Sequence, residues 1–398
     1  MPPSQRILIY AELLSNIRQV SVGCTLPTPI SEATRVTVAP DGWALTVAHD
    51  GSSETIRLPE SVALFSQLPI RESGGTGLSW RLPLATLATG RVLPAASEES
   101  VPWSATDLER GSTVICRMCK SNIVDTGTLK VWKDLPSENW AEMMEFWHCH
   151  KPHDHTHHNN DEHLTHRGYG SSSRITAQPG IGFVDLTSFL LADSDLVSSS
   201  ISASARTNRP GNGTKATITL HCTSCKTNLG VQNDKDASSI SLFKWQVLVQ
   251  QKSQINQESP PPSLAQCVSA MLLATMARSG CSKSILLPIK ARSPNDTSDS
   301  EDASRVQRLL NIWVFNANIT YSSTKAPTSP TGAIKVFYRT VSQQEADKML
   351  DSITSDVQDI SLPCEAITII SELLDKSNGF VPETDRKFKE WTVGLLVK

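Results

Sequence analysis

The sequence lacks three features that would point to a membrane or to nucleic acid. No run of about 18 apolar residues occurs that could form a transmembrane helix, and the segment from Met1 to Ile9 contains no apolar core of a secretory signal. No dense run of Lys or Arg occurs, and the formal net charge is -3. We therefore predict an intracellular, soluble protein that binds neither a membrane nor nucleic acid directly.

Nucleotide-binding loops and recognisable catalytic constellations are also missing from residues 1–100. The chain has 398 residues, of which 39% are hydrophobic, so it can bury sizeable cores in two or three domains. Its nine cysteines are an odd number. In a reducing compartment they are better explained as metal ligands and buried thiols than as disulfides.

The most specific feature is a pair of Cys-x-x-Cys motifs, Cys116 with Cys119 and Cys222 with Cys225. Two thiolates at this spacing can reach one tetrahedral ion from a tight turn, and two such pairs close a structural zinc site. We therefore predict one structural Zn²⁺ held by these four residues. The alternative is that one or both pairs are ordinary buried thiols.

A helix is predicted over residues 137–147, between the two cysteine pairs. Ser137 suits its N-cap, and Pro152 prevents its continuation. Its apolar stripe and the two residues presented at its end form a predicted partner-binding segment, which includes Trp140, Met144, Trp147, Cys149 and His150. Alternatively, Cys149 and His150 complete a local metal site with the first cysteine pair, which would leave the second pair for another metal or for none.

The order of the patterns predicts a β-rich α+β fold in three parts. Residues 1–100 alternate apolar and polar positions and predict an antiparallel β scaffold. The zinc-binding part covers residues 111–250 and carries two disordered insertions, one rich in histidine at 151–174 and one rich in serine and glycine at 193–215. Residues 260–398 form a C-terminal α+β domain.

Within these parts the patterns predict individual elements. Single strands are expected at Gly182–Leu191 and at Ile240–Val249. Ser342 is expected to cap a helix that ends near Thr354, and Pro363 to open another that Asn378 and Gly379 close. Cys364, next to that proline, is interpreted as a packing residue.

Several of these residues carry a resemblance to a known family. The first cysteine pair, the segment Leu135–Trp140, the run Trp147–His150, the second cysteine pair and the closing Trp391–Gly394 resemble the HECT-like proteins that bind ubiquitin-conjugating enzymes. The paired motifs followed by Leu229 and Gly230 also resemble the β-tent zinc fold of cereblon-type and Yippee-type domains. This second resemblance implies the zinc fold alone.

The family resemblance implies two activities and a location in nucleus and cytoplasm. One is that of a chaperone or inhibitor of the metallo-β-lactamase-type zinc endonuclease of pre-mRNA cleavage and polyadenylation, with Cys149 inserted into its active site. The alternative is a ubiquitin-protein ligase that accepts ubiquitin from a conjugating enzyme on a thiol. The sequence offers no well-placed catalytic cysteine, since Leu362 and Pro363 precede Cys364 whereas in HECT ligases the cysteine precedes a Leu-Pro. We therefore favour the first activity.

Overall fold

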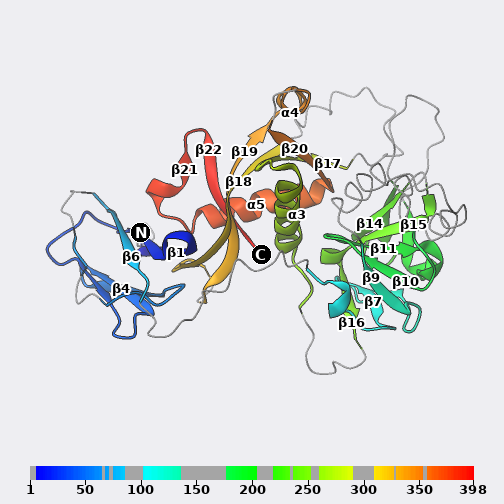
Figure 1. Cartoon of the computed structure of the whole chain (residues 1–398), viewed down its shortest axis with the longest axis horizontal. Coiled ribbons are helices and arrows are strands. Elements are labelled where there is room, and N and C mark those ends of the chain that lie inside the picture. The colour runs from blue at the N-terminus through cyan, green and yellow to red at the C-terminus, as the bar shows by residue number, and fades with distance from the viewer. Residues whose placement is uncertain are drawn as a thin grey trace, which may run out of the picture. The chain divides into compact units, whose positions relative to one another are not determined.

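The structure, a computed structural model, is a β-rich α+β fold (Figure 1). It describes residues 6–64, 68–70, 75–85, 102–135, 176–203, 218–233, 236–251, 260–289, 309–326, 329–352 and 356–398. The chain divides into two compact units. The first comprises Met1–Ser100, Ser279–Pro288 and Val306–Lys398, and the second comprises Val101–Arg278 and Ile289–Arg305.

A nine-stranded sheet forms the body of the first unit. Its main path runs β21 (Lys387–Phe388), β22 (Trp391–Val397), β19 (Thr331–Val341), β18 (Leu309–Ser323), β1 (Leu8–Leu14), β2 (Gln19–Thr25) and β6 (Gly77–Pro83). The long strand β18 also pairs with β17 (Lys283–Pro288), which pairs in parallel with β20 (Val357–Leu362). Figure 1 shows β18, β19 and β22 side by side with α5 (Cys364–Asn378) running along them.

The N-terminal strands are therefore part of the C-terminal sheet. In β1, Tyr10 pairs with Ser323 of β18. A small antiparallel sheet, β3 (Arg35–Val38), β4 (Ala44–His49) and β5 (Ser52–Arg57), packs its apolar face on β1, β2 and β6 in a shared core. Residues 1–100 are antiparallel β structure, but they are not a separate scaffold, because β1 needs β18 as its second neighbour.

Two helices cap this unit. The helix α4 (Gln343–Leu350) begins where the Ser342 hydroxyl accepts the Glu345 amide, as the sequence predicted, but it ends at Leu350, short of Thr354. The helix α5 begins after Pro363 and ends at Asn378, as predicted. Short 3-10 turns lie at Ser15–Ile17 and Glu383–Asp385.

The second unit contains a seven-stranded and a three-stranded sheet. The larger sheet runs β12 (Ile201–Ala203), β13 (Ile218–Cys222), β14 (Asn228–Asn233), β15 (Asp236–Phe243), β11 (Ser188–Ala192), β10 (Ile181–Val184) and β9 (Val131–Asp134). The smaller runs β16 (Val247–Gln250), β7 (Thr113–Cys116) and β8 (Asn122–Val124). The two share one apolar core, and α3 (Leu264–Ser279) follows them. Further 3-10 turns are η2 (Ala105–Asp107), η3 (Asp193–Asp195), η4 (Ser198–Ser200) and η5 (Lys244–Gln246).

Three sequence expectations in this unit are corrected. The single strand expected at Gly182–Leu191 is a hairpin of β10 and β11, which pair antiparallel. The insertion expected to be disordered from residue 193 is ordered through residue 203, because η3, η4 and β12 attach it to β13. Its remainder, and the insertion at 151–174, lie outside the described residues.

The third correction concerns the strand expected at Ile240–Val249. It is two strands, β15 and β16, that belong to different sheets. The chain changes sheets at η5, where the fully buried Lys244 donates from Nζ to the backbone oxygens of Pro102 at 2.5 Å and Trp103 at 3.1 Å. An alternation pattern cannot reveal this, since the break depends on a lysine that folds inward.

Candidate metal centre

The first cysteine pair lies in a tight turn between β7 and β8. The backbone amide of Lys120 donates to the oxygen of Cys116 at 3.0 Å, and the amide of Cys116 donates to the oxygen of Ser121 at 2.9 Å. Lys120 takes the left-handed conformation, with φ of 63°. These bonds curl the chain so that Cys119 turns back over the end of β7.

The second pair repeats this turn between β13 and β14. The amide of Lys226 donates to Cys222 O at 2.9 Å, the amide of Cys222 donates to Thr227 O at 2.9 Å, and Lys226 has φ of 62°. The two segments share the pattern Cys-x-x-Cys-Lys-(Ser or Thr). We name each such turn a cysteine knuckle, residues 116–121 and residues 222–227.

The fold brings the knuckles together from the two sheets. Cys116 Sγ lies 3.6 Å from Cys225 Sγ, and Cys119 Sγ lies 3.5 Å from Cys222 Sγ. All four sulfur atoms lie within 4.8 Å of one another. A hydrogen bond of 3.0 Å from Ser121 Oγ to Ser224 Oγ also joins the knuckles. The four predicted ligands are therefore adjacent, although about 100 residues of sequence separate the pairs.

The four thiols differ in their surroundings. The Cys119 thiol has a pKa lowered to about 6, chiefly by a hydrogen bond with the Ser121 hydroxyl. A hydrogen bond with the Thr227 hydroxyl likewise lowers the pKa of Cys225. Burial raises the pKa of Cys116 to about 12. Each knuckle thus has a deeply buried first sulfur and a half-exposed second sulfur beside a hydroxyl.

This arrangement fits a metal ion better than it fits disulfides. A tetrahedral ion with metal–sulfur bonds of about 2.3 Å places its sulfurs about 3.8 Å apart, close to the separations across the knuckles, whereas a disulfide needs about 2.05 Å. Four thiolates around a divalent ion carry a net charge of -2, and each knuckle places a lysine directly after its second cysteine. Four protein ligands leave no open coordination position, so the site is suited to structure and not to catalysis.

Sequence reasoning identified the four cysteines but missed the lysine and the hydroxyl that follow each pair. The signal was present, since Cys-Arg-Met-Cys-Lys-Ser and Cys-Thr-Ser-Cys-Lys-Thr agree at both added positions. The structure gives the reason for the agreement. The lysine is the residue that takes the left-handed conformation of the turn, and the hydroxyl contacts the less buried sulfur.

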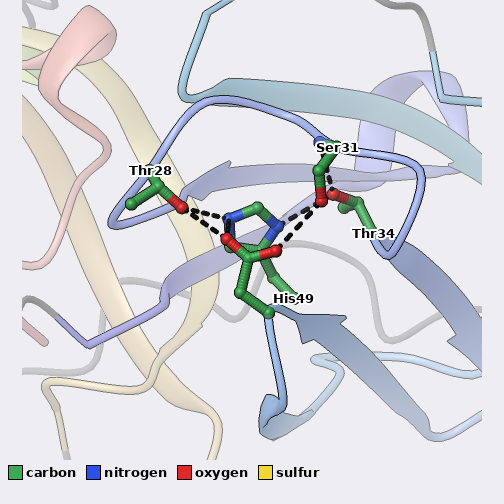
Figure 2. A network of polar contacts seen from close by, with 5 residues as sticks. Thr28, Ser31, Thr34 and His49 are labelled. Atoms are coloured by element: carbon green, nitrogen blue, oxygen red, sulfur yellow. Dashed lines mark hydrogen bonds and ion pairs between the residues drawn. The ribbon is translucent and has the colours of Figure 1, made fainter.

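A second polar cluster lies in the first unit (Figure 2). His49 is buried, with Nδ1 2.8 Å from Thr34 Oγ1 and Nε2 2.7 Å from Thr28 Oγ1. Thr28 donates its hydroxyl proton to Asp50 at 2.8 Å, so it accepts from Nε2–H. The Ser31 amide donates to Thr34, whose own proton then goes to Nδ1. Hydrogen bonds to the hydroxyls of Thr28 and Ser31 lower the pKa of Asp50.

The cluster fastens the loop after β2 to the turn after β4. Thr28, Ser31 and Thr34 of the loop contact His49 and Asp50, so these contacts tie the two segments together.

Comparison with known proteins finds similarity along nearly the whole chain. A profile of HECT-like ubiquitin-conjugating enzyme (E2)-binding proteins matches residues 12–393. The chain belongs to this HECT-like family. An uncharacterized protein of Schizosaccharomyces pombe is 27% identical over 362 residues, which cover 87% of this chain and 93% of the relative. An uncharacterized protein of Saccharomyces cerevisiae is 22% identical over 294 residues, 73% of this chain and 71% of the relative. No solved structure matches.

The partner-binding segment expected from the HECT-like resemblance is not placed by the structure. Trp140, Met144, Trp147, Cys149 and His150 lie outside the described residues. The alternative metal site, in which Cys149 and His150 join the first cysteine pair, is not needed to complete a set of four ligands, because all four cysteines of the two pairs cluster.

The cysteine nearest the C-terminus of this HECT-like chain requires a correction. Cys364 was interpreted as a packing residue, but it is exposed. It lies at the first position of α5, whose apolar face consists of Ala366, Ile367, Ile370 and Leu374. Cys364 falls off this face, so it adds nothing to the core. Cys267, in contrast, is buried.

Proposed function

We propose that this protein binds a ubiquitin-conjugating enzyme, and that its second unit is held in shape by a structural zinc ion at Cys116, Cys119, Cys222 and Cys225. The observation that supports binding is the family match, which extends through both units and not over a single module. The zinc proposal is supported by the clustered sulfurs, since four thiolates in tetrahedral reach favour zinc among the common ions.

The binding proposal can be tested with purified full-length protein and a panel of purified ubiquitin-conjugating enzymes, measured by calorimetric titration. We expect at least one enzyme to bind, with the same affinity whether or not its active site carries ubiquitin. If no enzyme in a panel that covers the conjugating enzymes of a fungal cell binds, the proposal is wrong.

The finer function that we favour is inhibition or chaperoning of the cleavage and polyadenylation endonuclease, in nucleus and cytoplasm. It depends on the partner-binding segment predicted from sequence, in which Cys149 would coordinate the partner's metal. Cys149→Ser should then keep the chain's own zinc and melting point yet lose most inhibition of the purified endonuclease. If this variant instead loses its own zinc, Cys149 is an internal ligand and this finer proposal fails.

The alternative function is ubiquitin ligation through a thiol. The one observation in its favour is that Cys364 is exposed at the start of α5, where its thiol could meet a conjugating enzyme that carries ubiquitin. A ubiquitin thioester that is sensitive to reductant, lost in Cys364→Ala and kept in Cys149→Ala, would establish ligation. Absence of any such adduct on the wild-type chain would leave binding without transfer.

A further inference from the structure

Five aromatic side chains of the first unit contact one another on one face of the nine-stranded sheet. Trp313 lies at their centre, with ring centroids 5.2 to 6.5 Å from each of the other four. Phe337 stacks on Phe388 at 5.2 Å and lies 4.7 Å from Phe315. We name this cluster the aromatic patch: Trp313, Phe315, Phe337, Phe388 and Trp391.

The patch lies on the sheet face opposite α5. Phe337 pairs in register with Trp313 and with Val393, so these side chains share one face. The next residue, Tyr338, points to the other face, where its hydroxyl donates to Asp375 of α5 at 2.5 Å. A side chain at Gly394, next to Val393, would likewise meet Leu374 of α5. The helix therefore covers one face and leaves the patch on the other.

Part of the patch is exposed to solvent. Phe337 and Trp391 are 6% and 7% exposed, but Phe315 is 57% exposed and Phe388 is 44% exposed. These two belong to the seven large hydrophobic side chains that are exposed in the described part of the chain. Both exposed phenylalanines contact the buried Phe337, so they lie near each other on the same face. Exposed apolar side chains that gather in this way are typical of a surface that binds a partner.

Cations surround the patch. Lys283 lies over Trp313 at 5.6 Å and Arg339 over Trp391 at 5.1 Å, and these two cations are already paired with Asp356 and Glu345. Lys389 is different. It is exposed, lies in the turn between β21 and β22 with its Nζ 5.6 Å from the centre of the Phe388 ring, and forms no salt bridge with any residue that the structure describes.

The hairpin also offers main-chain groups. Among the residues that the structure describes, the two-residue strand β21 is the last strand on its side of the sheet and pairs there with β22 alone. An edge strand has one row of amide and carbonyl groups free to bind another chain. Phe388 thus stands on an open edge beside Lys389, a cation without a salt bridge in the described part of the chain.

We propose that the aromatic patch with Lys389 is the surface on which the ubiquitin-conjugating enzyme docks. The charge requires the enzyme to present an apolar side chain beside a carboxylate, with the apolar group between Phe315 and Phe388 and the carboxylate on Lys389. Rigid aromatic side chains supply most of the energy of such contacts, and the lysine selects the partner's charge. This inference rests on the proposed function.

The test uses full-length protein and the conjugating enzyme that binds the wild type most tightly. Phe388→Ser and Phe315→Ser should each weaken binding at least tenfold, and Lys389→Glu should weaken it by a factor that grows as salt is lowered. Ile369→Ser is the matched control, because Ile369 is also 44% exposed but lies on α5. Lys348→Glu, on α4, is the control for charge.

The outcomes separate this inference from the function on which it rests. If the wild type binds no conjugating enzyme, the proposed function fails. If it binds one and the patch variants, with unchanged melting points, bind as tightly as Ile369→Ser does, the function stands and the docking surface is elsewhere. Affinity restored to Lys389→Glu by an acidic-to-lysine change on the enzyme would identify the carboxylate that faces it.

Discussion

Lys244 shows how one residue can redirect a chain. Its ammonium group is wholly buried, donates to two backbone oxygens and lies 5.6 Å from the Phe189 ring. Burial lowers its pKa from 10.5 to about 8, because removing water penalises the charged form. The residue joins η5 to the segment before η2, and it costs stability whenever it is protonated.

This gives a pH dependence with a definite sign. Between pH 8 and 10.5 the unfolded chain binds more protons at this lysine than the folded chain does, so stability rises with pH, by up to about 1.4 kcal/mol per pH unit. We expect the free energy of unfolding in urea, monitored by hydrogen exchange of β15, to rise between pH 8 and pH 9. Lys244→Met should remove it.

Two comparisons make that measurement specific. Lys133→Met, at an exposed lysine on β9, should leave the slope unchanged. Burial raises the pKa of Cys267 to about 12, which makes stability fall as pH rises above about 9, so the difference between wild type and variant is the quantity to use. An equal slope in Lys244→Met and wild type would show that Lys244 is not the group responsible.

At the scale of elements, β14 and β15 approach more closely than side chains normally allow. A Cβ added at Gly230 would lie 2.1 Å from Ser241 O and 2.9 Å from Leu242 Cα, which are backbone atoms of β15. This close approach explains why the residue after Leu229 is a glycine, which has no Cβ.

Gly230→Ala should therefore destabilise the second unit by about 2–4 kcal/mol, because backbone atoms cannot move aside as a flexible side chain can. The measurement is the free energy of unfolding from urea titration. Gly332→Ala is the control, since an added Cβ there meets nothing within 4 Å, and it should change stability by less than about 0.5 kcal/mol. Equal effects would contradict the close-approach explanation.

At the scale of the whole molecule, the chain divides into two compact units. The second unit has its own apolar core and the cysteine cluster, and the first has separate cores on both faces of its sheet. Metal binding and folding are linked where ligands come from distant parts of the sequence. The metal should therefore stabilise one unit and not the other.

Removal of the metal tests this linkage. We expect one zinc per chain by elemental analysis, and a strong chelator should abolish hydrogen-exchange protection in β7 and β13 while β18 and β19 stay protected. Cys222→Ser should reproduce the effect, and Cys281→Ser, outside the cluster, should not. Loss of protection in β18 to the same extent would mean that the two units unfold together.

Much of the local structure could be predicted from the sequence. Motif spacing found the four cysteines that cluster, and cap residues found the starts of α4 and α5. What could not be predicted depends on contacts between distant residues. The pairing of β1 with β18, the inward turn of Lys244, and the aromatic patch assembled from β18, β19, β21 and β22 leave no periodic signal in any one segment.

The place of β1 has a consequence for synthesis on the ribosome. Its partner β2 emerges almost at once, but β18 follows roughly 300 residues later, which takes about 15–60 s at ordinary translation rates. During that time the second unit, encoded between them, can fold first, while β1 keeps one unpaired edge. The partly synthesised chain is therefore a substrate for chaperones. The first unit, whose synthesis starts first, is the last to complete its fold.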